Sequence, residues 1–108
     1  MTAEKGFRFA PLDWSPDAAR KAAQAEHLTL GEDHWDVVRG LQEFYARRTA
    51  APVSVRELQD ALEEKFHHKG GMKYLYTLFP GGPIAQGCRL AGLKAPTGAT
   101  DRGFGSVA

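Results

Sequence analysis

The chain has 108 residues, of which 43% are hydrophobic and 25% are charged, and its formal net charge at pH 7 is +1. This length suits one domain with its own core, and the composition is ordinary for a globular protein. No apolar run approaches the ~20 residues that a membrane-spanning helix needs, and residues 1–5 are too polar for a signal peptide. We therefore expect a cytoplasmic protein without membrane contact.

The charges are distributed unevenly along the chain. Residues 1–64 hold eight Lys or Arg against twelve Asp or Glu, whereas residues 65–108 hold six against one. The basic end would attract an acidic partner or a nucleic acid. The alternative is a solvated surface that balances the acidic half.

The first 14 residues predict an irregular cover with at most one short strand. Four large apolar side chains alternate loosely there: Phe7, Phe9, Leu12 and Trp14. We expect the aromatic rings among them to pack over the helices that follow.

Ser15 with Pro16 and Asp17 is a helix-start signal, because it combines a cap, a first-turn proline and an acid near the positive end of the dipole. A first helix is predicted to run to about Glu26.

Two further helices are predicted by hydroxyl caps that a carboxylate follows at capping-box spacing. These pairs are Thr29 with Glu32 and Ser54 with Glu57. The helix over about residues 31–48 carries an apolar stripe made of Val37, Val38, Leu41, Phe44 and Tyr45. It ends before Pro52, because the residue before a proline is pushed out of the α region. The next helix turns four apolar side chains inward: Val55, Leu58, Leu62 and Phe66.

Residues 70–93, GGMKYLYTLFPGGPIAQGCRLAGL, predict two short helices. Pro80 lacks a backbone donor and ends the first of them, while Pro83 suits the first turn of the second. Gly92 then supplies a C-terminal stop. Residues 95–108 hold many small residues and few apolar anchors, so they are predicted to form a flexible C-terminal arm.

Cys88 is the only cysteine and thus the only candidate sulfur nucleophile, and it excludes an internal disulfide. It either carries a persulfide or is a small buried residue on the face of Ile84 and Ala91. It lies past the first turn of its helix, where the helix dipole does little to lower a thiol pKa. Arg89 points about 100° away from it, since that is the angle between helical neighbours. Both readings stay open.

No other catalytic or metal-binding pattern stands out. The chain has four histidines: His27, His34, His67 and His68. None has a cysteine at ligand spacing, so we expect neither a metal nor another cofactor. Neither a phosphate-binding Gly-rich loop after a strand nor a nucleophile elbow is present.

The segment KYLYTLFPGGPIAQGCRLAGLKAPTG (residues 73–98) resembles the C-terminal signature of the DsrC/TusE sulfur-relay family. That signature reads roughly K-Y-L-Y-x-L-F-P-x-G-P-x-x-Q-x-C-x-x-A-G-L-P-x-P-x-x-C. Weaker similarity continues upstream in LDW, LTLGEDHWDVVRGLQEFY and VREL, so it covers nearly the whole chain. Family members are small, mostly helical carriers that accept persulfide sulfur, for example toward tRNA 2-thiouridine or dissimilatory sulfite reductase.

The resemblance and the helical pattern together predict a mainly α fold, a compact bundle of about five helices. One domain over residues 1–94 is expected, with room for a minimal N-terminal β-hairpin. The sequence departs from the family at the sulfur acceptor, a cysteine eleven positions after the one that matches Cys88. Here that position is Ala99, and the chain continues through TDRGFGSVA.

Four residues are candidates for the functional site. Cys88 is the candidate sulfur-carrying thiol. By resemblance, Arg56 anchors the folded-back arm, although a plain surface arginine is the alternative. Lys73 and Tyr74 match the family as walls of the groove where that arm, or a partner, would dock.

The resemblance thus predicts a sulfur-relay protein. If the protein is an enzyme, it is at most a sulfurtransferase-like carrier. The resemblance implies relay donor proteins or a sulfite-reductase-type complex as partners. The alternative is a regulatory paralogue that binds relay partners, or DNA through a helix-turn-helix-like pair formed by the second and third helices. Phosphates would be repelled by the carboxylates expected on the third helix: Glu57, Asp60, Glu63 and Glu64.

Overall fold

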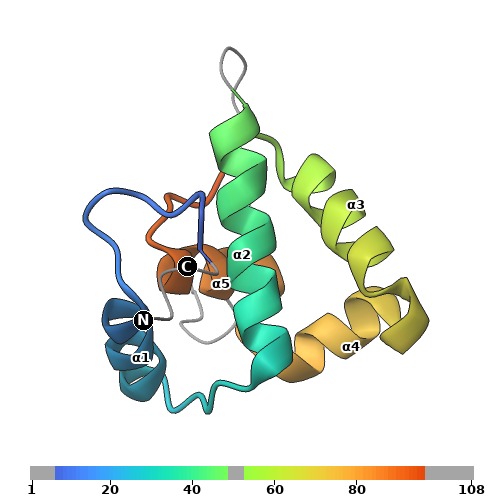
Figure 1. Ribbon diagram of the computed structural model, residues 1–108. Coiled ribbons are helices and arrows are strands. Elements are labelled where there is room, and N and C mark those ends of the chain that lie inside the picture. Colours follow the sequence, from blue (N-terminus) through green and yellow to red (C-terminus); the bar gives the residue numbers. More distant parts are fainter. Residues whose placement is uncertain (1–6, 49–52, 97–108) are drawn as a thin grey trace, which may run out of the picture.

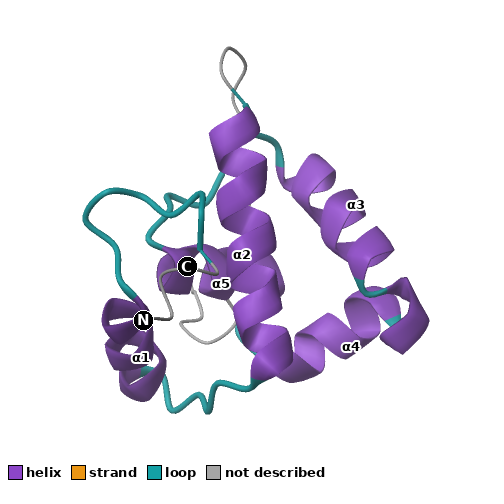
Figure 2. Ribbon diagram, viewed as in Figure 1, coloured by secondary structure: helices purple, strands orange, loops and turns teal. Residues whose placement is uncertain are grey.

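The computed structural model describes residues 7–48 and 53–96. Its helices are α1 (Pro16–Ala25), α2 (Glu32–Arg47), α3 (Val55–Lys65), α4 (Gly71–Leu78) and α5 (Pro83–Ala91), with a 3₁₀ turn at His67–Lys69. Figure 1 shows α2 as the long central helix, with α1 and α3 on opposite sides and α5 crossing behind it. Figure 2 shows helices and loops, and no strand, over the described residues. The prediction of a mainly α fold of about five helices is confirmed.

Two of the predicted helix caps are confirmed. The hydroxyl of Ser15 accepts a hydrogen bond from the N–H of Ala18 at 3.2 Å, and that of Ser54 accepts one from Glu57 at 3.1 Å. These bonds satisfy amide groups that have no partner inside the helix.

The predicted Thr29 cap is wrong, because α2 begins only at Glu32 and its N-cap is Gly31. The Gly31 amide is instead bound by the Nδ1 atom of His34, at 3.0 Å. The second imidazole nitrogen of His34, Nε2, then donates to the carbonyl of Leu78 at 2.9 Å and ties the start of α2 to the end of α4.

The short strand that the sequence allowed is absent from residues 7–14, which form two turns, while residues 1–6 lie outside the described residues. The N–H of Ala10 donates to the carbonyl of Phe7, and that of Trp14 donates to Pro11. The Phe7 ring lies 4.9 Å from Trp14 and 5.6 Å from Trp35 between ring centroids, so the aromatic cover exists without a strand.

The core lies between α2 and the other helices. Its largest fully buried side chains include Phe79, Leu41, Leu58, Leu75, Leu90, Val37 and Val38. Gly87 on α5 allows the close approach to α2, since a Cβ there would lie 2.8 Å from the Cδ1 of Leu41. The absence of a side chain at Gly87 thus permits the close crossing of α2 and α5.

The end of α5 is held by the N-terminal segment. The indole N–H of Trp14 donates to the carbonyl of Leu90 at 2.7 Å. Gly92 ends the helix in the left-handed region, with φ of 77°. The predicted C-terminal stop is therefore confirmed. Glycine adopts the left-handed conformation at little cost.

None of the helices within residues 7–48 and 53–96 is both long enough and apolar enough to cross a membrane.

Candidate functional site

The thiol of Cys88 is fully buried on α5, with 0% of the residue exposed. Burial raises the pKa of Cys88 to about 11, against the smaller lowering effects of the Tyr45 hydroxyl and the Arg89 charge. A thiol with this pKa is almost entirely protonated at neutral pH, and only the thiolate is a nucleophile. In this structure Cys88 therefore behaves as a small apolar core residue.

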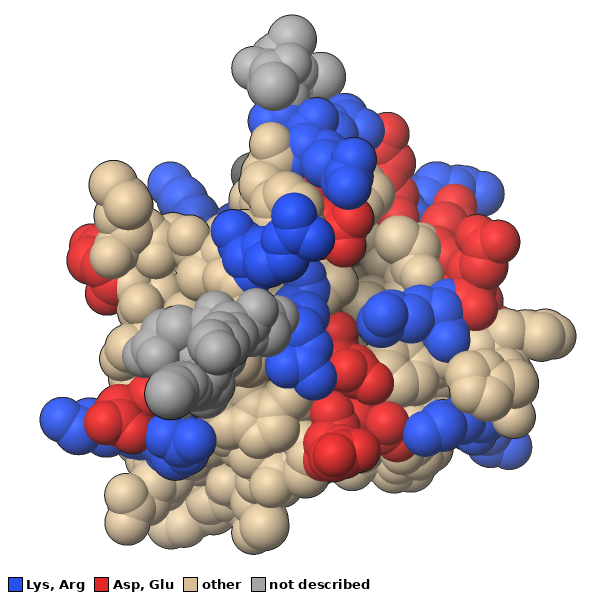
Figure 3. Space-filling view, in the orientation of Figure 1, with Lys and Arg blue, Asp and Glu red and all other residues tan. Residues whose placement is uncertain are grey.

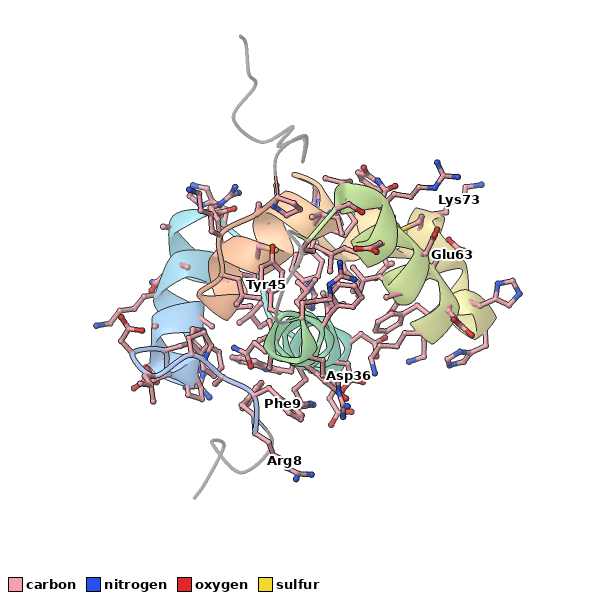
Figure 4. The ribbon with its side chains drawn as sticks, turned by 90° about the horizontal axis from the view of Figure 1, so that it is seen from above. Arg8, Phe9, Asp36, Tyr45, Glu63 and Lys73 are labelled. Carbon is pink, nitrogen blue, oxygen red and sulfur yellow. The ribbon has the colours of Figure 1, made fainter. Side chains whose placement is uncertain are left out.

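Tyr45, in the last turn of α2, lies between Cys88 and the segment that follows α5. Its hydroxyl oxygen is 3.8 Å from the sulfur of Cys88 and donates to the carbonyl of Lys94 at 2.6 Å. Figure 4 shows Tyr45 on the side of α2 opposite to Arg8 and Phe9. Burial raises the pKa of Tyr45, so the hydroxyl stays protonated and able to donate at neutral pH.

A surface hollow adjoins Tyr45 and has a volume of about 580 Å³. Two segments distant in the sequence line it together with Tyr45: Val53, Ser54 and Val55 at the start of α3, and Lys94, Ala95 and Pro96 after α5. Tyr45 is thus shared between the hollow and the surroundings of the Cys88 sulfur. Its lining includes Ala95 and Pro96, the first two residues of the predicted C-terminal arm.

Arg56 is exposed and directly follows Val55 in the lining of the hollow. The structure therefore places it near the root of the predicted arm. Ala99 and residues 97–108, most of that arm, lie outside the described residues. The role of Arg56 as an arm anchor stays a prediction.

Lys73 and Tyr74 lie on α4 and not beside the hollow. The Tyr74 hydroxyl donates to the carboxylate of Asp33, and the ammonium of Lys69 lies 3.0 Å from both oxygens of that carboxylate. The Tyr74 bond is the largest cause of the lowered pKa of Asp33.

Asp33 and Tyr45 belong to the first and last turns of α2, roughly 18 Å apart along the helix axis. Figure 4 looks along α2 and shows the exposed side chain of Lys73 pointing outward at the edge of the molecule, away from Tyr45 near the middle. The structure thus brings Arg56 and Cys88 to one end of α2 and Tyr74 to the other. A groove role for Lys73 and Tyr74 stays a prediction.

Arg89 points away from Cys88 and toward α1. Its guanidinium binds both carboxylate oxygens of Glu26 at 2.8 Å, and the side-chain amide of Gln86 donates to one of them. The Arg89 hydrogen bonds are the main cause of the lowered pKa of Glu26, while burial opposes them. This network fixes the outer face of α5 and leaves Cys88 on the inner face.

Charges of both signs are mixed on the face that α2 and α3 present. Figure 3 shows basic and acidic side chains interspersed over the face that α2 and α3 present. The ion pairs on these helices include Arg39 with Asp36, Arg47 with Glu43, and Arg48 with Glu57. Lys69 of the basic end pairs with Asp33 of the acidic half. This mixing favours a solvated surface over a separate basic patch.

Within the part of the chain that the structure describes, no group of three or more His, Cys, Asp or Glu could hold a metal ion. His34 has a structural role, described above at the start of α2.

The family model for DsrC like protein matches residues 1–100. This chain belongs to the DsrC-like family. Sulfurtransferase TusE of Yersinia pestis is 40% identical over 96 residues, which cover 88% of this chain and 87% of the relative. Sulfurtransferase TusE of Escherichia coli (strain K12) is 38% identical over 96 residues, with the same two coverages.

A solved structure supports the same assignment to the DsrC-like family. The NMR structure of Allochromatium vinosum DsrC has a TM-score of 0.69 and 44% sequence identity, and the match covers 90% of this chain and 87% of that chain. The family resemblance read from the sequence is confirmed.

Sequence reasoning missed the polar role of Tyr45 in this DsrC-like chain. The spacing of Tyr45 assigns it to the apolar stripe of α2, whereas its hydroxyl partners lie 43 and 49 residues further along the chain. One signal was available, because a tyrosine on a buried stripe needs a partner for its hydroxyl. The identity of that partner depends on tertiary structure.

Proposed function

We propose that this protein relays sulfur between protein partners in the cytoplasm, with Cys88 as the thiol that holds the transferred sulfur. Its membership of the DsrC-like family, with relatives named sulfurtransferase TusE, carries the proposal. Cys88 is the only cysteine of the chain, and reducing cytoplasmic conditions suit such a thiol. The partners would be a relay donor protein and an acceptor such as a sulfite-reductase-type complex.

The transfer step follows from thiol chemistry. The Cys88 thiolate attacks the terminal sulfur of a donor persulfide, a new S–S bond forms, and the S–S bond of the donor breaks. The donor leaves as a thiolate and takes up the proton that Cys88 lost, so no oxidant or reductant is needed. The step requires a reachable thiolate. The buried thiol with its pKa of about 11 must therefore be uncovered first.

The chain would divide into a helical domain over residues 1–94 and an arm over residues 95–108. Arg56 is suited to a role near the transferred sulfur, because it is exposed beside the hollow and its guanidinium can bind a persulfide anion. Lys73 is also exposed, and it would contact a partner at the other end of α2.

Intact-mass spectrometry tests the proposal directly. The wild-type protein, incubated with a persulfide-loaded sulfurtransferase, should gain one sulfur atom that a reductant removes. The Cys88→Ser variant should gain none. If the wild type binds the loaded donor but its mass stays unchanged, the carrier function is refuted.

The burial of Cys88 and the alanine at position 99 favour a second candidate, a regulatory member that binds relay partners without carrying sulfur. It predicts partner binding that is unaffected by Cys88→Ser. DNA binding is the less favoured form of regulation, because α3 exposes three carboxylates: Glu57, Asp60 and Glu64. A band shift with duplex DNA at physiological salt would separate the two forms.

A further inference from the structure

We infer that Tyr45 is a latch over Cys88, and that an acidic polypeptide segment of a sulfur donor entering the adjacent hollow releases it. The inference rests on the proposed function, since it specifies how the buried thiol is reached. It assigns to Tyr45 a positioning role that is separate from the chemistry of the sulfur atom.

The contacts of one hydroxyl group carry the latch. The Tyr45 oxygen holds the Lys94 carbonyl at 2.6 Å and lies 3.8 Å from the Cys88 sulfur. The same side chain belongs to the wall of the hollow. Movement of Tyr45 away from Lys94 would therefore loosen the segment after α5 and open the sulfur toward the hollow.

The latch is local, which makes a partial opening feasible. Lys94 lies beyond the C-terminus of α5, which ends at Ala91. Breaking its bond with Tyr45 leaves the helical hydrogen bonds of α2 and α5 in place. Exposing the thiol in this way would lower its pKa toward the ordinary value, because burial is the main cause of the raised pKa.

The chemistry of the hollow indicates the kind of segment that fits it. Val53, Val55, Ala95 and Pro96 provide apolar surface, while Lys94 in the lining is exposed and basic. Arg56, also exposed, follows Val55 in the chain. An extended segment that carries carboxylates beside its persulfide would complement these two charges.

Thiol labelling measures the latch without any sulfur donor. Wild type and Tyr45→Phe would be alkylated with iodoacetamide at pH 8, and the modified fraction followed by intact mass. Loss of one hydrogen bond should raise the labelling rate about fivefold, beyond the change that the urea-unfolding stability of the variant predicts. Tyr76→Phe, the same chemical change on α4, should alter labelling only as far as its global stability changes. Equal stability-corrected rates for all three proteins would overturn the latch.

The wild type alone supplies a second measurement, which holds even if Tyr45→Phe folds poorly. If the thiol is reached by a local opening, labelling at low urea should depend weakly on urea. If it is reached only by global unfolding, the urea dependence should match the full unfolding m-value, and the latch is then refuted.

The route through the hollow has its own control. Lys94→Gln keeps the carbonyl that Tyr45 binds but removes the charge. It should slow labelling by anionic iodoacetate relative to neutral iodoacetamide at low salt, and an unchanged ratio would exclude the hollow as the route.

The same variants separate the latch from the proposed function. Faster labelling of Tyr45→Phe without sulfur uptake from a persulfide donor would leave the latch standing and refute the carrier function. Sulfur uptake by the wild type, with labelling unaffected by Tyr45→Phe, would do the reverse.

Discussion

Glu26 and Arg89 are 63 residues apart in the chain, yet they share two hydrogen bonds of 2.8 Å each. Glu26 is the C-cap residue of α1, where the helix dipole disfavours a negative charge. The guanidinium from α5 outweighs this effect and lowers the pKa of Glu26. The pair therefore joins α1 to α5 only while the carboxylate is ionised.

Replacing Glu26 by Gln should destabilise the protein by about 1–2 kcal/mol at pH 7, since it removes a charge-assisted pair that is partly buried. The folded-state pKa of Glu26 is lowered, so its contribution is present above the ordinary value of 4.5 and is lost as the pH falls through the folded-state value. Urea unfolding of both proteins at pH 7 and at pH 3 measures this. The difference should shrink at the acidic pH.

The exposed pair of Glu43 with Arg47 provides the control for that experiment. Glu43→Gln should change the free energy of unfolding by less than about 0.5 kcal/mol, because exposed helical pairs contribute little. An equal loss in both variants would show that the Glu26 contact is no stronger than a surface pair.

Replacing Gly87 by Ala should destabilise the protein by about 1 kcal/mol or more. The new Cβ would lie 2.8 Å from Leu41 Cδ1, and the cost of overpacking outweighs the better helix propensity of alanine. At Gly40 on α2 the corresponding Cβ would make an ordinary contact of 3.6 Å with the Lys65 side chain. Gly40→Ala should thus stabilise by up to about 1 kcal/mol. Urea unfolding of both variants measures the two changes, and the same sign for both would contradict this account of the α2–α5 crossing.

The free energy of unfolding should fall at alkaline pH because of Cys88. Its pKa is raised from 9.0 to about 11 on folding, so its contribution is complete below pH 9 and is lost as the pH rises toward 11. At pH 10 the loss from this group is about 1.4 kcal/mol, one pKa unit of linkage. Urea unfolding at pH 7.5 and pH 10 measures it. Cys88→Ala should show a smaller loss over the same range, and parallel pH profiles would argue against the raised thiol pKa.

The Ala99→Cys variant tests whether the family arm can still reach the core. Ten residues separate positions 88 and 99, and a loop of this length closes readily, so mild oxidation should join the introduced thiol to Cys88. Thiol labelling with intact mass detects the bridge, and a second variant that ends at Thr100 tests for interference by the extension. If the Ala99→Cys protein forms no bridge, either at full length or when it ends at Thr100, the arm no longer docks as in the family.

The helices were predictable because their signals are local. Ser15 and Ser54 cap helices as expected, and Gly92 ends α5, since each signal acts within one turn of backbone. Pro80 and Pro83 likewise set the boundary between α4 and α5. The Cys88 environment was predictable in part, because the helical face it shares with Ile84 indicated burial.

The failed and missed features depend on contacts between distant segments. His34 takes the place of the predicted Thr29 cap, because its ring binds both the Gly31 amide and the Leu78 carbonyl. The orientation of Arg89 away from Cys88 was predicted, but its partner was not, because Glu26 lies at the C-cap of α1. Spacing within one segment carries no information about such partners.

Trp14 is an intrinsic fluorescence probe of the end of α5. Its indole N–H is bound to the carbonyl of Leu90, two residues from Cys88, so its emission wavelength reports the state of the end of α5. Trp35, the other tryptophan, can be replaced by Phe to leave a single emitter. Opening or sulfur loading at Cys88 can then be followed in real time by fluorescence, without a dye on the one thiol that must stay free.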